Sequence, residues 1–281
     1  MKIAIVFYGQ PRDVVDSFKS IKQRLLDNPN VEIDLFAHMW ESHEYKEALE
    51  LYKFKEVKLE QPKDFSNLYN GKNGYCSKSF TLYPMWYSIQ NGCELLKNYI
   101  KKNNVKYDFV VRLRFDMFFH HDLVFDTLDK TLLYTSEAAW PGSHLFDDSW
   151  SICGQNIYIE VYKELYAKFV ARHINRTFIH RGEENTYEHI NELGLLELVK
   201  RERMLDFALN RDKEIFYNLN ERDTNDFLVS ILSIENMNLK PILSVLCVAR
   251  SQFADAYEYQ LKLIDFCSFG HSDYYLYSFI V

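Results

Sequence analysis

The strongest constraint on the fold comes from the order of apolar patterns in residues 1–37. Residues 2–8 form a short β-branched run that predicts a buried strand, and the turn-forming sequence Gly9-Gln10-Pro11-Arg12 follows it. Apolar residues then recur at helical spacing in residues 14–25, and residues 31–37 repeat the strand pattern. A strand, a helix and a second strand in so short a segment predict a parallel sheet, with ligands at the carboxyl ends of its strands.

The same alternation continues along the chain and predicts an α/β fold with a mostly parallel central sheet flanked by helices. Residues 61–76 contain Pro, Asn, Gly and Ser with little periodicity, so we expect a long loop, which in a compact domain often serves as a functional flap. No internal repeat or low-complexity linker interrupts the sequence, so we expect one domain over residues 1–281. Further strands are predicted at residues 56–59, 107–113, 132–135 and 204–209, and helices at residues 44–54, 82–100, 157–169 and 183–193.

The composition argues against several classes of partner. The formal net charge is −7 and no long Lys/Arg run occurs, so nucleic acid is not an expected partner. The 5 cysteines are scattered without a Cys-x-x-Cys pair, which is typical of reduced, buried thiols. No stretch approaches the ~18–20 apolar residues of a membrane span, and the N-terminal pattern is not that of a signal peptide. We therefore expect a cytoplasmic protein with no membrane span; no pattern indicates an oligomeric state.

The sharpest local signal is a group of charges at the end of a predicted buried strand. Arg112, Arg114 and Asp116 alternate along the chain, so in a strand they point to the same side. Buried charges are costly unless they are paired or bound to a ligand. An aspartate here can hold a divalent cation or sugar hydroxyls, and guanidinium groups can bind phosphate oxygens in bidentate fashion. The alternative is a structural Arg–Asp network that closes the strand end.

These motifs resemble those of A-type-fold glycosyltransferases, the Rossmann-like single-domain enzymes that use a nucleotide-diphospho-sugar donor. More narrowly, the chain resembles small bacterial and viral transferases of surface-polysaccharide or glycan synthesis. The resemblance covers roughly residues 1–210 and rests on Gly9-Gln10-Pro11-Arg12, on Asp34, Phe36, His38 and Trp40, on the run from Tyr107 to Asp116, on Asp147-Asp148-Ser149-Trp150 and on Glu184.

The resemblance implies a hexosyl- or pentosyltransferase that moves a sugar, with a UDP-sugar as the favoured donor, to a hydroxyl of a glycan acceptor in polysaccharide or glycoprotein glycan synthesis. Residues 1–120 would form the nucleotide-sugar-binding half. Residues 121–281 would form the acceptor-binding half and a C-terminal tail. If the chain is viral, the expected location is the host cytoplasm.

The resemblance also implies a donor site at the carboxyl ends of the first strands. Gly9, Gln10, Pro11 and Arg12 would form the donor loop, although a plain strand-to-helix turn explains the same four residues. Tyr8, just before the loop, is a further donor-binding candidate. His38 and Trp40 would meet the base or ribose, the alternative being a hydrogen-bonded core histidine. Lys78 would contact phosphate, the alternative being a solvated lysine. The remaining donor-binding candidates are Arg112, Arg114 and Asp116.

The metal requirement is open at the sequence level. The family's metal motif is Asp-x-Asp, whereas this chain has Arg114-Phe115-Asp116 at that place. A guanidinium could therefore take over part of the role of a Mn²⁺ or Mg²⁺ ion in neutralising the leaving diphosphate. The candidate metal ligands are Asp116 and, in the C-terminal tail, His271.

Three carboxylates are candidates for the catalytic base that takes the proton from the acceptor hydroxyl. Asp148 is preferred over Asp147 because it matches the acidic position of the resembled pattern; the alternative for both is an Asx turn or helix cap. Glu184 is the third candidate, and its alternative is a favourable charge in the first turn of a helix.

Two other classes of function are compatible with parts of the sequence. A sulfotransferase would carry a hydroxyl-containing phosphate loop after the first strand, and a nucleotidyltransferase would carry a longer Gly-rich loop with a lysine. The residues Gly9-Gln10-Pro11-Arg12 have neither feature. A non-catalytic glycan- or nucleotide-binding module is the remaining alternative.

Overall fold

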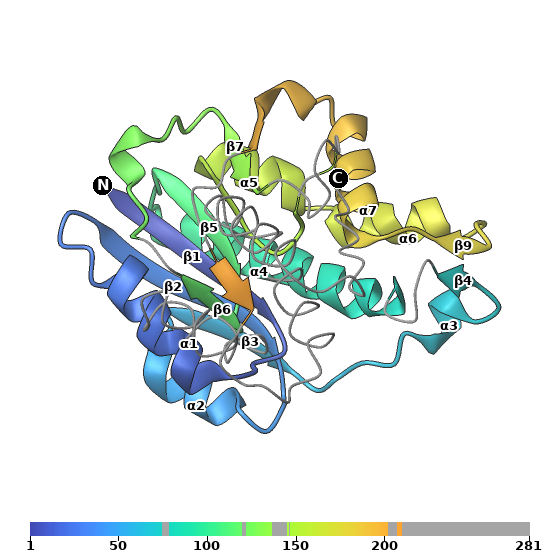
Figure 1. Cartoon of the computed structure of the whole chain (residues 1–281), viewed down its shortest axis with the longest axis horizontal. Helices are drawn as coiled ribbons and strands as arrows, with labels where there is room; N and C mark the ends of the chain where they lie inside the picture. The colour runs from blue at the N-terminus through green and yellow to red at the C-terminus, as the bar shows by residue number, and fades with distance from the viewer. Residues whose placement is uncertain (75–78, 120–121, 137–144, 146, 202–206, 210–281) are drawn as a thin grey trace, which may run out of the picture.

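The computed structural model describes residues 1–74, 79–119, 122–136, 145, 147–201 and 207–209 (Figure 1). Its centre is a seven-stranded sheet in the order β10-β7-β8-β5-β1-β2-β3. The pairs β1–β2, β1–β5, β2–β3 and β7–β10 are parallel, and β8 runs antiparallel to both β5 and β7. The α/β class with a mostly parallel sheet is therefore confirmed.

The strands of this sheet are short except for β1 and β2. Their bounds are β1 Lys2–Gly9, β2 Glu32–Trp40, β3 Glu56–Glu60, β5 Phe109–Arg114, β7 Leu133–Thr135, β8 Ser151–Cys153 and β10 Val199–Arg201. Two small strand pairs are separate from this sheet: β6 Met117–Phe119 with β11 Phe207–Leu209, and β4 Asn73–Gly74 with β9 Phe178–Ile179.

Helices cover both faces of the sheet (Figure 1). One face packs against α1 and α2, and the other packs against α4, which is joined there by α5, α6 and α7. The bounds are α1 Val14–Ile21 with a π-helical continuation Lys22–Leu26, α2 Tyr45–Tyr52, α3 Ser66–Tyr69, α4 Leu82–Asn103, α5 Gln155–Tyr162, α6 Leu165–His173 and α7 Gly182–Glu192.

Strand β1 divides the core into two halves. Its side chains alternate, so that Ile3, Ile5 and Phe7 enter the core under α1 and α2. Ala4, Val6 and Tyr8 enter the core under α4. Because both faces are covered, the strand is apolar at nearly every position, as expected for a central parallel strand.

Helix α4 approaches β1 closely because it carries a glycine where the two meet. A Cβ atom at Gly92 would lie 2.8 Å from Val6 Cγ1, so a larger residue would push the helix away from the sheet. One turn earlier, the small residue Ser88 lies on the same side of the helix and is fully buried. This close contact brings Ser88 next to the end of β1.

Two expectations about the elements need correction, and a third is tested only in part. The predicted loop at residues 61–76 contains the short helix α3 and the strand β4, and residues 75–76 lie outside the described part. The helix predicted at residues 157–169 is two helices, α5 and α6, which are separated at Lys163 and Glu164. The apolar spacing of four continues across this break, so the pattern could not reveal it. Of the predicted strand at residues 204–209, β11 forms the last part, and residues 204–206 lie outside the described part.

Among the described helices, none is both long and apolar enough to cross a membrane.

The buried carboxylate of Asp34 ties β2 to its surroundings. Its exposed fraction is 4%, Tyr107 Oη donates to Oδ2 at 2.8 Å, and Lys2 Nζ lies 3.2 Å from the same oxygen. Burial tends to raise the pKa of Asp34, but the hydrogen bonds from Tyr107 and Lys2 outweigh it, so the pKa is lower than its ordinary value of 3.8.

We predict that Asp34→Asn lowers the free energy of unfolding at pH 7 by about 1–3 kcal/mol, because Lys2 and Tyr107 lose a charged acceptor. The stabilisation from a carboxylate with a lowered pKa is present above its ordinary pKa and is lost as the pH falls below it. Chemical denaturation should therefore show a smaller difference between wild type and variant at pH 3 than at pH 7. An equal difference at both pH values would contradict this role.

Candidate active site

Three chain segments meet at the carboxyl ends of β1 and β5. Tyr8 lies beside Arg114 in the β1–β5 register, and Ser151 of β8 lies beside Arg112. Because β8 runs antiparallel to β5, the residues just before it, Asp147 to Ser149, lie next to the end of β5. The sheet topology thus brings the sequence candidates from residues 8, 112–116 and 147–148 to one place.

Arg112 and Tyr8 hold the backbone before β8. Arg112 Nη1 donates to the carbonyl oxygen of Asp148 at 2.7 Å, and Tyr8 Oη donates to the carbonyl oxygen of Ser149 at 2.9 Å. The guanidinium of Arg112, with 3% of the residue exposed, lies 5.1 Å from the centre of the Tyr8 ring and 5.2 Å from that of Tyr162. Arg112 therefore positions the segment that carries Asp148.

Arg114 and Asp116 form a bidentate ion pair. Arg114 Nε and Nη2 donate to the two carboxylate oxygens of Asp116 at 2.8 and 2.7 Å. The Arg114 side chain is 26% exposed and that of Asp116 is 7% exposed. Two of the three charges predicted to share one side of the strand thus bind each other, while the third, Arg112, binds the Asp148 segment.

Asp148 is the preferred sequence candidate for the catalytic base. Its pKa is raised to about 7, first by burial and then by the nearby charges of Asp147 and Glu183, while Arg112 and Arg114 act in the opposite direction. Its Oδ2 lies against Gly182, the first residue of α7. The two are so close that a Cβ atom at Gly182 would be only 1.7 Å from Oδ2. A helix N-terminus favours a negative charge, so this position stabilises the carboxylate once it is ionised.

The carboxylates of Asp147 and Glu184 both accept hydrogen bonds from nearby backbone N–H groups. Asp147 Oδ1 accepts from the backbone N–H of Ser149 at 2.5 Å and from the Ser149 hydroxyl, which is an Asx turn. Glu184 Oε2 accepts from the backbone N–H of Arg181 at 2.9 Å and so caps α7. These hydrogen bonds are those expected for the alternative roles of Asp147 and Glu184, a turn and the first turn of a helix.

A small pocket lies next to Asp148 on the α4 side of the sheet. It combines two charged residues of the site with mainly apolar side chains from four helices. It is lined by Trp86, Ile89, Arg112, Asp148, Val161, Tyr162, Leu165, Thr186 and His189.

The loop after β1 is open to solvent. Gly9 has φ +94°, and a Cβ atom there would meet no described atom within 4 Å, so the backbone conformation rather than crowding requires glycine. Gln10 and Arg12 are exposed, and Arg12 Nη2 donates to Gln10 Oε1 at 2.9 Å. The N–H of Gly9 is bound to Ser88 Oγ at 2.7 Å and is therefore not directed at a ligand.

His38 and Trp40 lie inside the protein. Even-numbered residues of β2 face α4, where His38 is fully buried and Trp40 stacks on Tyr87 with ring centres 5.6 Å apart. Both ring nitrogens of His38 have partners, which is the arrangement of a hydrogen-bonded core histidine. Lys78 and His271 lie outside the described residues.

The described residues do not fit a divalent cation at Asp116. Both of its oxygens are occupied by Arg114, and a guanidinium stands where a second carboxylate would be needed. Within the described part of the chain, no group of three or more His, Cys, Asp or Glu side chains is arranged to hold a metal.

Three residues of this region were missed by the sequence analysis. Ser88 and Glu60 contact His38, and Gly182 makes room for Asp148. The available signal for Ser88 was a small polar residue on the apolar stripe of a long helix, followed four residues later by Gly92. Gly182 and Glu60 gave no signal, since their roles depend on contacts with residues far away in the sequence.

Neither a protein-family model nor a curated protein sequence matches the chain. Among solved structures it is similar to the glycosyltransferase GlyE of Streptococcus pneumoniae TIGR4 in its apo form, with 14% identity, a TM-score of 0.40, and coverage of 71% of this chain and 44% of that one. A second GlyE structure has 15% identity, a TM-score of 0.38 and coverage of 71% and 45%. Mouse xyloside xylosyltransferase 1, apo form, has 10% identity, a TM-score of 0.39 and coverage of 72% and 85%.

The chain spans less than half of the GlyE chains it resembles. At these TM-scores the likeness decides neither the activity nor the site, which we derive from the residues themselves.

We predict that turnover depends on the ionisation of Asp148. A general base must be deprotonated to accept a proton, so kcat/KM of a reaction that uses Asp148 in this role should rise with pH to a plateau above about pH 7. Asp148→Asn should lower kcat by about 10²–10⁴-fold. Asp147→Asn keeps an acceptor for the Asx turn but removes a like charge, so it should move the acidic limb to lower pH. If the acidic limb of the kcat/KM profile lies at the same pH in Asp147→Asn as in wild type, Asp148 is not the group that titrates.

We also predict that Gly182→Ala lowers kcat, because its Cβ would displace the Asp148 carboxylate. Alanine favours a helix over glycine by about 1 kcal/mol, so a loss of activity could not be ascribed to a weaker α7. The matched control is Gly154→Ala at the start of α5, where a Cβ would crowd the carbonyl oxygen of Lys130 at 2.2 Å. Equal losses of kcat in both variants, measured alongside thermal unfolding, would argue against a specific effect on Asp148.

Proposed function

We propose that this protein is a glycosyltransferase that moves a sugar from a nucleoside diphosphate donor, with UDP as the favoured nucleotide, to a hydroxyl group of a glycan. The observation that carries the proposal is the position of Asp148. A carboxylate with a pKa of about 7 lies beside Arg112 and Arg114 at the carboxyl ends of the central strands, where α/β sheets bind ligands.

The proposed reaction is a direct displacement. Asp148 takes the proton from the acceptor hydroxyl, and the oxygen attacks the anomeric carbon of the donor sugar. The bond from that carbon to the diphosphate oxygen breaks, and the nucleoside diphosphate leaves with the electron pair. One proton is transferred to Asp148 for each glycosidic bond formed.

Arginine side chains are proposed to stabilise the negative charge on the leaving diphosphate. Arg114 is the best placed, because it is partly exposed and its guanidinium can exchange part of its pairing with Asp116 for two phosphate oxygens. Arg12, on the exposed loop after β1, is the second. Arg112 remains a positioning residue, since its donors hold the Asp148 segment.

The activity test uses a panel of nucleotide sugars with a glycan acceptor mixture. Donor consumption and thermal shift are recorded with Mn²⁺, with Mg²⁺ and with EDTA. Since Asp116 is bound to Arg114, we predict that one donor series is turned over and that turnover persists in EDTA. Binding with no turnover of any donor would instead favour a non-catalytic binding module. No binding by any donor would overturn the proposal.

The matched variants compare two Arg–Asp pairs. Arg114→Gln removes the proposed phosphate ligand and should lower kcat/KM by about 10²–10³-fold, the usual effect of losing one preorganised donor in the transition state. Arg24→Gln removes an arginine that pairs with Asp122 at 3.1 Å outside the site. The control should retain kcat/KM within about twofold. Equal kcat/KM for the two variants would remove Arg114 from the donor site.

A further inference from the structure

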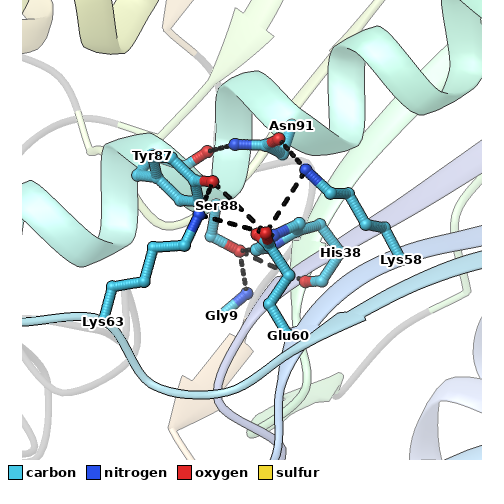
Figure 2. Close-up of polar contacts among 8 residues, drawn as sticks. All are labelled: Gly9, His38, Lys58, Glu60, Lys63, Tyr87, Ser88 and Asn91. Carbon is cyan, nitrogen blue, oxygen red and sulfur yellow. Dashed lines mark hydrogen bonds and ion pairs between the residues drawn. The ribbon is translucent and has the colours of Figure 1, made fainter.

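A chain of polar groups, buried at its centre, runs from β3 to the end of β1 (Figure 2). Ser88 Oγ, on α4, lies 2.7 Å from the backbone N of Gly9 and 2.7 Å from His38 Nδ1. His38 Nε2 lies 2.7 Å from Glu60 Oε2. Ser88 and His38 are both fully buried. Three strands and a helix are thus joined by hydrogen bonds that end on the glycine where the loop begins.

The surroundings of Glu60 fix the charge at one end of this chain. Burial tends to raise the pKa of Glu60, but hydrogen bonds from His38 and Lys63 outweigh it and bring the pKa down to about 2. Lys63 Nζ lies 3.1 Å and Lys58 Nζ 3.6 Å from Oε1, and Tyr87 Oη donates to the same oxygen at 3.4 Å. The carboxylate is therefore an acceptor only.

That fixed acceptor gives each hydrogen bond one direction. His38 Nε2–H donates to Glu60, which leaves Nδ1 of a neutral imidazole as an acceptor. The hydroxyl of Ser88 then donates to Nδ1 at 2.7 Å, which is closer than its other acceptor, the carbonyl oxygen of His38 at 3.2 Å, and its oxygen accepts the N–H of Gly9. Such chains polarise their members in the same sense, so the bond to Gly9 is strengthened by the carboxylate two groups away.

The order serine, histidine, carboxylate is also that of hydrolase triads, but the geometry excludes a nucleophile here. Ser88 is 0% exposed, and its oxygen accepts from a backbone N–H. A nucleophilic serine needs an oxygen that can reach a substrate carbonyl. The hydrogen-bonded groups therefore serve to fix the backbone conformation of Gly9.

Gly9 is the point where this conformation matters. It has φ +94°, and no described atom lies within 4 Å of where its Cβ would be, so a ligand can approach its backbone. The preceding residue, Tyr8, holds the Asp148 segment through Ser149, and the loop that follows carries Arg12. A change at Gly9 would therefore displace the loop that carries Arg12 and weaken its contacts with a bound donor.

We infer that Ser88 is a positioning residue of the donor site: supported by His38 and Glu60, it holds the N–H of Gly9 and keeps the loop from Gly9 to Arg12 in the conformation that binds the donor diphosphate. This inference rests on the proposed function, because it is the donor site that the loop serves. A loop held in its binding conformation before the ligand arrives saves the cost of ordering it on binding.

The test compares two buried serines. Ser88→Ala removes the hydroxyl that binds Gly9. The control, Ser20→Ala, removes a hydroxyl that is 5% exposed and accepts the N–H of Phe119 at 2.8 Å, outside the site. We expect Ser88→Ala to raise the Kd for UDP and the KM of the donor about tenfold with kcat nearly unchanged, the pattern of lost uniform binding. Ser20→Ala should leave both constants unchanged, although both variants lose some thermal stability.

Two further measurements separate positioning from a loss of stability. Glu60→Gln keeps an acceptor for His38 but removes the charge, so its effect on donor KM should lie between those of wild type and Ser88→Ala. Hydrogen exchange without nucleotide should show faster exchange of the Gly9 amide in Ser88→Ala and not in Ser20→Ala. Equal UDP affinity in wild type and Ser88→Ala, or an unchanged Gly9 exchange rate, would overturn the inference while leaving the proposed function intact. If wild type itself binds no nucleotide sugar or nucleoside diphosphate, the proposed function fails first and the inference fails with it.

Discussion

The buried guanidinium of Arg112 is the interaction on which the rest of the site depends. Burying a charge is unfavourable unless it is well paired, and here two tyrosine rings and the carbonyl oxygen of Asp148 provide the compensation. The same contacts fix the backbone before β8, which carries Asp148 to the start of α7. Arg112 shares the support of this backbone with Tyr8, whose hydroxyl donates to the carbonyl oxygen of Ser149. A charged residue near the end of β5 thus helps to position the proposed base.

Four carboxylates that could not be distinguished by sequence differ in their contacts in the structure. Asp147 completes a turn, Glu184 caps a helix and Asp116 pairs with Arg114. Only Asp148 combines a pKa near neutrality with a position between arginines and a helix N-terminus. Different surroundings can give carboxylates very different pKa values. A carboxylate whose pKa lies near 7 is suited to accept and release a proton at neutral pH.

Much of the fold, and part of the site, could be predicted from local pattern. The alternation in β1 and the strand–helix–strand order were sufficient for the parallel sheet, and period-two spacing correctly grouped Arg112 with Arg114. The Arg114–Asp116 pair is local and matches the Arg–Asp network considered as the alternative in the sequence. Pattern could not show that Arg112 turns to the segment at residue 148, because that contact depends on a distant strand, β8. For the same reason Ser88, Glu60 and Gly182 escaped notice: each acts through a residue that is remote in sequence and adjacent only once α4, β3 and α7 have packed.

The most direct test of this account is a crystal structure of the protein with UDP. The account predicts the diphosphate at the carboxyl ends of β1 and β5, with its oxygens bound by the Arg114 guanidinium and with Asp148 facing the side from which the acceptor would come. Arg114 would exchange at least part of its pairing with Asp116 for phosphate oxygens. A nucleotide bound elsewhere, with the Arg114–Asp116 pair unchanged, would contradict it.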